Sequence, residues 1–186
     1  MKILALISLF SIVALAQEKP EWRYSKEENP LYGKSFDRFV LTGHYFKTPS
    51  TVGNEPPKMI IGCMNGKFST GEFSLGAFAQ FSGTRSLKGL AQSKITIRRD
   101  EQKRTEDWFE VTNDQKTLFF DRIQFNKFLT GRLLGHPSEQ DALVHRLTVG
   151  VVEAFGNQVI VQFEMPGDVS QLVEACGLEW GKAKKK

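Results

Sequence analysis

Apolar and polar residues alternate along much of this chain, and a period of two is the pattern of half-buried β-strands. The clearest case covers residues 72–81, where one face of the expected strand carries only apolar side chains: Phe73, Leu75, Ala77, Ala79 and Phe81. Branched and aromatic residues predict further strands over 36–46, 58–64, 95–97, 108–111, 143–153 and 158–165. Such a series of short strands predicts a mainly antiparallel β fold.

Turn residues separate these strands. Asn65-Gly66 and Gly156-Asn157 predict tight hairpins, because glycine and asparagine tolerate positive φ. The segment from Thr48 to Pro57 contains prolines and a Gly-Asn pair that cannot sustain a strand, so it is predicted to be the longest loop. The charged run over 98–104 is most simply a solvated turn.

Two segments change to the spacing of a helix. In the first, residues 121–134, Asp121 is the predicted N-cap of an apolar stripe. Its members recur three and four positions apart: Phe125, Phe128, Leu129 and Leu133. In the second, Asp168 and Gln171 predict a capping box, and Gly177 predicts the end of the helix. Its apolar stripe comprises Val169, Leu172, Val173 and Cys176.

These elements predict an antiparallel β sandwich or partly open barrel of about seven or eight strands with two short helices. Cys63 and Cys176 are the only cysteines. In an oxidising compartment such a pair is expected to form a structural disulfide. Because Cys176 falls on the apolar stripe of the second helix, this bond would pin the C-terminal helix to the sheet.

The N-terminus has the organisation of a signal peptide. Lys2 precedes an apolar run over 3–13, and Ala14-Leu15-Ala16 is a small-x-small cleavage site. The run is shorter than the ~20 residues that a membrane-spanning helix needs. The mature protein is therefore expected to be periplasmic or secreted and not membrane-spanning. The predicted organisation is a signal peptide (1–16), an extended lead-in (17–34), a single β-rich domain (35–180) and a disordered lysine tail (181–186).

The charge of the chain is concentrated at this tail. Residues 17–180 hold 20 Lys and Arg against 21 Asp and Glu, although the whole chain carries a net charge of +4. A lysine tail favours weak, salt-screened contact with an anionic surface, and its simplest role is a solubilising end without a partner.

The sequence lacks the common catalytic motifs. It has no G-x-S-x-G element and no glycine-rich phosphate loop, and His44, His136 and His145 lack metal-ligand spacing. No metal, cofactor or catalytic residue is therefore predicted, and the expectation is that the protein is not an enzyme. A carboxylate pair for glycoside hydrolysis stays open. Its candidate members are Glu72, Asp107, Glu110, Glu153 and Glu164.

A family resemblance rests on the two cysteine contexts and the segments between them. These are Met59-Ile60-Ile61-Gly62-Cys63, Ile95-Thr96-Ile97-Arg98-Arg99-Asp100, the Trp108 strand, and Glu174-Ala175-Cys176-Gly177-Leu178-Glu179-Trp180. Their order resembles small exported accessory proteins of type VI secretion loci, the VasI/TagO type, and uncharacterised secreted proteins of soil bacteria. The resemblance implies an accessory role and carries no catalytic residue.

The leading hypothesis is a non-catalytic exported binding or accessory module of the bacterial cell envelope, with a protein or envelope component as its partner. A small inhibitor of an extracytoplasmic hydrolase is the alternative, and an uncharacterised hydrolase is the third. Acidic neighbours dilute the basic cluster, so no nucleic-acid partner is expected. The candidate binding surface comprises Thr48, Pro49, Asn54, Pro56, Arg98, Arg99, Lys103 and Arg104.

Overall fold

The computed structural model describes residues 20–29, 33–47, 55–75, 91–112, 116–130, 144–152 and 158–178. The predicted signal peptide and lysine tail, with most of the 48–57 loop, lie outside these residues. The described elements are β1 (Arg23–Asn29), β2 (Lys34–Thr42), β3 (His44–Lys47), β4 (Lys58–Met64), β5 (Lys67–Ser74), β6 (Gln92–Arg99), β7 (Thr105–Val111), β8 (Thr117–Phe120), α1 (Arg122–Thr130), β9 (Arg146–Val152), β10 (Gln158–Glu164) and α2 (Ser170–Ala175).

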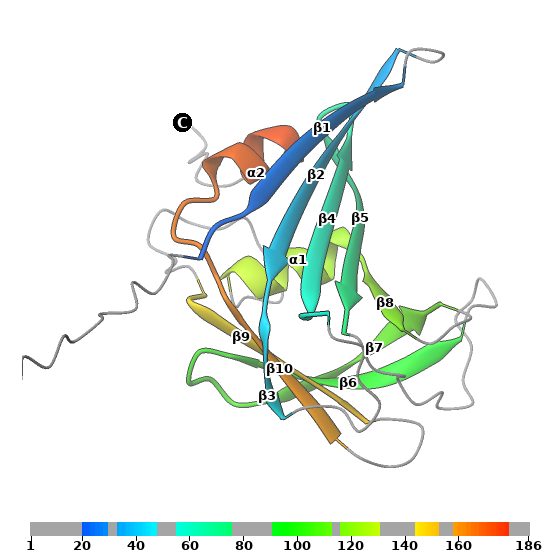
Figure 1. Cartoon of the computed structure of the whole chain (residues 1–186). Coiled ribbons are helices and arrows are strands. Elements are labelled where there is room, and N and C mark those ends of the chain that lie inside the picture. The colour runs from blue at the N-terminus through cyan, green and yellow to red at the C-terminus, as the bar shows by residue number, and fades with distance from the viewer. Residues whose placement is uncertain are drawn as a thin grey trace, which may run out of the picture.

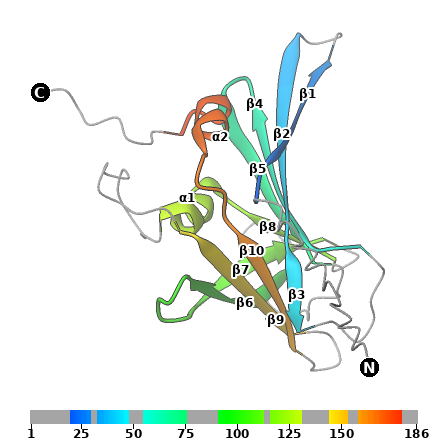
Figure 2. The same cartoon turned by 60° about the vertical axis from the view of Figure 1, so that its left-hand side comes forward.

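All ten strands belong to one sheet with the order β1-β2-β4-β5-β8-β7-β6-β9-β10-β3. The pairs are antiparallel throughout. Strands β1, β2, β4 and β5 form one wall, the strands from β6 to β10 and β3 form the other, and α1 lies on the concave side where the walls meet (Figure 1). Figure 2 shows the same arrangement after rotation.

One glycine lets this sheet close on itself. Only Gly43 separates β2, which pairs with β4, from β3, which pairs with β10. A Cβ atom at Gly43 would lie 2.6 Å from the Gln162 carbonyl oxygen and 2.7 Å from the Phe163 ring. A larger residue would therefore push β10 away from the point where the chain passes from one wall to the other.

The core is aromatic at its centre. Phe73 of β5 is fully buried, and its ring centroid lies 4.7 Å from that of Phe120 and 5.5 Å from that of Phe128. Phe125, Phe128 and Leu129 form the buried stripe of α1. This stripe confirms the apolar face that the spacing predicts for the first helix, while Leu133 lies outside the described residues.

The expected disulfide is present and joins α2 to the β4–β5 hairpin. Cys63 and Cys176 are bonded with a Cα–Cα distance of 5.0 Å, and both are fully buried. The Phe68 amide also donates to the Cys176 carbonyl at 2.9 Å. Gly177 has φ +57°, and a Cβ atom there would collide with the Gly66 carbonyl oxygen. The end of α2 is therefore held by covalent, hydrogen-bond and steric constraints together.

The two predicted helix caps have different outcomes. At α1 the Asp121 carboxylate accepts the Gln124 amide N–H at 2.8 Å, and the Gln124 side chain accepts the Asp121 N–H at 3.0 Å. At α2 the predicted capping box is wrong. The Asp168 carboxylate instead accepts the Ser170 N–H at 2.9 Å, because α2 begins only at Ser170 and leaves Asp168 outside the cap position.

The mainly β fold with two short helices is confirmed, and the described residues contain more strands than the seven or eight expected. β1 lies within the segment predicted to be an extended lead-in, where it pairs with β2. β8 has only four residues, which gives little room for a visible alternation. No helix within the described ranges is long and apolar enough to span a membrane.

Candidate functional site

The residues of the predicted binding surface do not form one site in the described structure. Thr48, Pro49 and Asn54 lie outside the described residues, and Pro56 is exposed. Lys103 and Arg104 are exposed in the turn between β6 and β7. Arg98 is half exposed and forms an ion pair with Glu101 of the same turn, which fits the interpretation of this run as a solvated turn.

The prediction that Arg99 belongs to an exposed binding surface needs correction, because its side chain is buried, with 8% exposed. It lies on β6 in phase with Ile95 and Ile97, which both face the core, so the alternation of the strand turns Arg99 inward. Burial lowers the pKa of the guanidinium, and attraction to Asp107 opposes that shift. Arg99 is therefore unavailable as a surface contact.

Asp100 gives the same turn a structural role. It has a positive φ of 45°, and its carboxylate accepts the backbone N–H groups of His145 and Arg146 at 2.8 and 2.7 Å. Its own N–H donates to the Arg146 carbonyl. The acidic residue that dilutes the basic run thus ties the β6–β7 turn to the start of β9.

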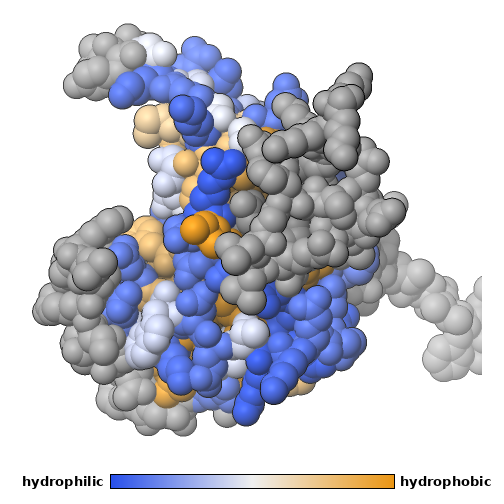
Figure 3. All heavy atoms as spheres, turned by 180° about the vertical axis from the view of Figure 1, so that it is seen from behind, coloured by the Kyte–Doolittle hydropathy of each residue, from blue (hydrophilic) through white to orange (hydrophobic). Residues whose placement is uncertain are grey.

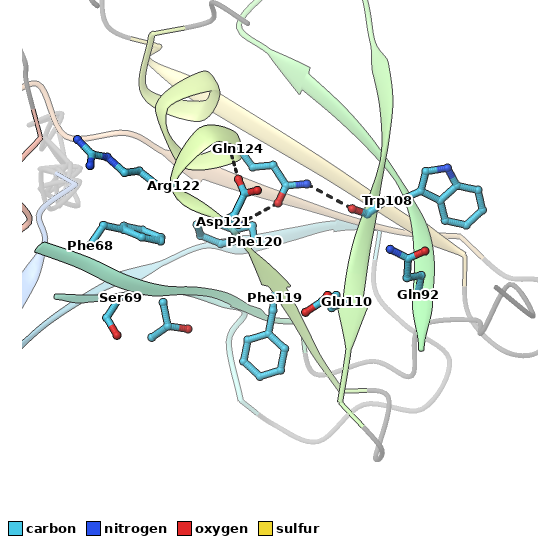
Figure 4. Close-up of a pocket in the computed structure, with 11 residues that line it drawn as sticks. Phe68, Ser69, Gln92, Trp108, Glu110, Phe119, Phe120, Asp121, Arg122 and Gln124 are labelled. Carbon is cyan, nitrogen blue, oxygen red and sulfur yellow. Dashed lines mark hydrogen bonds between the residues drawn. The ribbon is translucent and has the colours of Figure 1, made fainter. Parts of the chain in front are cut away.

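A groove of about 550 Å³ lies elsewhere, beside the N-terminal end of α1. It extends across β5, β8, β7 and the start of β6 (Figure 4). Four of its lining residues are aromatic: Phe68, Trp108, Phe119 and Phe120. The other seven are polar: Ser69, Thr70, Gln92, Glu110, Asp121, Arg122 and Gln124. The described lining residues include no Ala, Val, Leu, Ile or Met, and the volume of the groove falls in the range of small-molecule sites.

The pairing register explains why these side chains meet. Phe119 of β8 lies opposite Glu72 of β5 on one side and Glu110 of β7 on the other. Glu110 in turn lies opposite Gln92 of β6. Residues directly opposite in neighbouring strands point to the same side of a sheet. A row of four residues therefore crosses four strands on the outer face.

Trp108 extends this row along β7. It is two residues from Glu110 and shares its face, whereas Phe109 and Val111 point into the core. The indole is 43% exposed, and Figure 4 shows it beside Gln92 at one end of the groove. An exposed indole of this size offers a flat apolar surface with one hydrogen-bond donor.

The N-terminal turn of α1 forms another side of the groove. The side-chain amide of Gln124 donates to the Trp108 carbonyl oxygen at 3.3 Å, while its oxygen belongs to the cap with Asp121. Arg122 points away from the groove centre and donates to the Gly177 carbonyl at 3.3 Å. The cap therefore fixes the distance between the helix and the Trp108 strand.

The charges next to the groove are mostly neutralised in pairs. Lys94, opposite Trp108, forms an ion pair with Glu106, and this contact lowers the Glu106 pKa. The Lys127 Nζ atom lies 3.8 Å from the Asp107 Oδ2 atom, within ion-pair distance. Among the described residues, Glu110 has no ion-pair or hydrogen-bond partner. Its carboxylate can thus accept from a ligand, whereas the carboxylate of Asp121, which also lines the groove, accepts the Gln124 N–H.

The described histidines lie apart from this groove. His44 contacts the Gln162 side chain at 3.1 Å, His145 precedes β9, and His136 is outside the described ranges. No group of three or more His, Cys, Asp and Glu side chains in the described ranges could hold a metal ion.

Sequence reasoning missed Trp108, Phe119, Gln92 and Gln124 as site residues. One signal was available, because the inward positions Phe109 and Val111 place Trp108 on the outer face of its strand. The position of β8 between β5 and β7 was not available, since it depends on pairing between distant segments.

Comparisons with protein-family models, with curated proteins and with solved structures find no match for this chain. The candidate site therefore rests on the residues of the groove and their geometry.

Proposed function

We propose that this protein is an exported, non-catalytic binding module and that the groove between β7 and α1 is its ligand site. The observation that carries this proposal is the lining: among its described residues the non-polar side chains are all aromatic, and an indole stands exposed at one end. A large aromatic surface next to convergent polar groups is typical of small-molecule recognition.

The N-terminal sequence and the disulfide support export. Lys2, the apolar run and Ala14-Leu15-Ala16 have the order of a cleaved signal peptide. The Cys63–Cys176 bond is of the kind that persists in oxidising compartments. An accessory role in the cell envelope, as the family resemblance implies, is consistent with a binding module.

The face seen in Figure 3 also bears on the kind of partner. Its described residues are mostly hydrophilic, and the hydrophobic ones are scattered among them instead of forming one patch. Large contiguous apolar patches mark protein or membrane contacts.

Fragment screening by nuclear magnetic resonance tests the proposed site. The oxidised, isotope-labelled protein is titrated with a library of neutral, cationic and anionic aromatic and polar fragments. We expect hits to shift the resonances of Trp108, Glu110 and Gln124 first. The Trp108→Ala variant should lose these shifts, whereas Phe46→Ala, which removes an exposed aromatic side chain from β3, should keep them. Hits confined to other surfaces, or no hit at all, would contradict the proposal.

Intact mass spectrometry tests export. Protein recovered from the extracytoplasmic fraction of the native host should begin at Gln17, because Ala14 and Ala16 are the small residues of the cleavage site. Recovery from the cytoplasm with residues 1–16 retained would contradict this part of the proposal.

A further inference from the structure

We infer that the groove binds a neutral, β-linked saccharide chain, with Trp108 as the main stacking surface. This inference rests on the proposed function, since it names the ligand class of the same groove. Three features of the groove support it: the aromatic surface, the polar side chains and the shape of the sheet face that carries both.

The aromatic surface of the groove suits the chemistry of sugar rings. A pyranose with equatorial substituents presents C–H groups on both ring faces and hydroxyls around its edge. The faces of aromatic rings are electron-rich and attract the positively polarised hydrogens of C–H groups. Trp108 is 43% exposed and Phe119 is half-buried on the same outer face, so both rings are accessible to such a ligand.

The polar part concerns hydroxyl groups, which both donate and accept hydrogen bonds. The groove provides a carboxylate acceptor at Glu110 and hydroxyl groups at Ser69 and Thr70, next to the side-chain amide of Gln92. A lipid or an apolar peptide would require aliphatic contacts, and none of the described residues of the lining is Ala, Val, Leu, Ile or Met. The combination of aromatic rings with hydroxyl, amide and carboxylate groups matches a ligand that is apolar on its faces and polar at its edges.

The third part is the shape of the site. Trp108 and Phe119 are diagonal neighbours on adjacent antiparallel strands, a relation that separates backbone positions by about 7–8 Å. Both belong to the outer face of one sheet, and Glu110 lies directly opposite Phe119 and two residues from Trp108 along β7. A β-1,4-linked chain is extended and flat, so successive rings can follow such a surface. An α-1,4-linked chain curves away from it.

Isothermal titration calorimetry with four probes tests the inference. Cellotetraose and chitotetraose are the β-linked chains, maltotetraose is the α-linked control, and spermidine tests whether Glu110 and the aromatic rings select a cation instead. We expect saturable binding of at least one β-linked tetraose and no binding of maltotetraose or spermidine. The reducing-end content of the same samples should stay constant.

Three variants locate the binding. Trp108→Ala should weaken the β-linked tetraose by about tenfold or more, since central aromatic anchors dominate such sites. Trp108→Phe should recover part of the affinity, which a purely structural role would not explain. Glu110→Gln preserves an acceptor and should change saccharide affinity by less than about threefold, because only a cationic ligand requires the full charge. Phe46→Ala is the matched control and should bind like the parent protein.

The possible outcomes distinguish failure of the saccharide inference from failure of the proposed binding function. Fragment binding in the groove without binding of either β-linked tetraose overturns the saccharide inference and leaves the proposed function in place. Binding of maltotetraose or spermidine alone also overturns the inference. A β-linked tetraose whose affinity is unchanged by Trp108→Ala overturns the assigned site. New reducing ends, lost in Glu110→Gln, would contradict the non-catalytic function.

Discussion

Trp108 and Phe109 are neighbours in sequence and lie on opposite faces of β7. Phe109 is fully buried and contacts the α1 and β5 aromatics, with its ring centroid 6.2 Å from that of Phe128. Trp108 is 43% exposed and lines the groove. The comparison shows how one strand supplies both the core and the candidate site, because alternate residues of a strand face opposite sides. The two faces can therefore be tested separately.

The largest expected effect comes from the inner face. Phe109→Ala should lower the free energy of unfolding by about 3–5 kcal/mol, since it removes a fully buried ring and leaves a cavity. Trp108→Ala should cost about 1 kcal/mol or less, because much of the indole is exposed. Urea denaturation of both variants measures the difference. Equal losses of unfolding free energy at the two positions would contradict the assignment of Phe109 to the core and Trp108 to the outer face.

The disulfide allows a similar test at a position outside the groove lining. Replacing Cys63 and Cys176 together with serine should lower the free energy of unfolding by about 2–4 kcal/mol, because the bond constrains a long loop of the unfolded chain. Ligand affinity should be unchanged, since neither cysteine lines the groove. Denaturation and ligand titration of the double variant test both points, and titration of free thiols in the parent protein should find none.

Asp121 has two roles, because it lines the groove and also caps α1. Asp121→Ala should lower the free energy of unfolding by about 1 kcal/mol, which is the usual cost of losing an N-cap. Asp121→Asn retains a capping oxygen and should lose only a few tenths of this value. If the loss appears in affinity alone, with stability unchanged in both variants, Asp121 contacts ligand and does not anchor α1.

The smallest expected effect appears at alkaline pH and concerns Tyr24 of β1. The Tyr24 hydroxyl donates to the Asp37 carboxylate at 2.7 Å, and this hydrogen bond raises the Tyr24 pKa above its ordinary value of 10.0. A raised pKa means that the contribution to stability is complete below pH 10 and is lost as pH rises through the higher folded-state pKa. The stability difference between the parent and Tyr24→Phe should therefore shrink above pH 10. A difference that stays constant from neutral to alkaline pH would contradict this assignment.

Local patterns predicted several strands and the apolar stripe of α1, but the strand expected over 72–81 is different, because β5 spans Lys67–Ser74 and residues 76–81 lie outside the described part of the chain. β4 spans Lys58–Met64 as the apolar run indicates, and the Asn65-Gly66 turn carries positive φ at both residues. The disulfide followed from the presence of only two cysteines. Each of these signals lies within a few residues or depends on a unique pair, so sequence alone is sufficient.

The remaining features depend on contacts between distant segments. Arg99 belongs to a charged run, yet the phase of β6 turns it inward. The groove requires β8 to insert between β5 and β7, and no local pattern specifies that order. Predicted loop residues were favoured as binding sites because loops often carry function, whereas the groove lies on the outer face of the sheet.

The junction at Gly43 also determines when the protein can become complete. β3 emerges early in synthesis, but its partner β10 is the last of the described strands. Pairing between such distant segments carries a large loop-closure cost and slows folding. A nascent or truncated chain that ends before residue 158 would present β3 and β9 as unpaired edges, which are templates for aggregation. These two edges are therefore protected from misassembly only once β10 has paired with them.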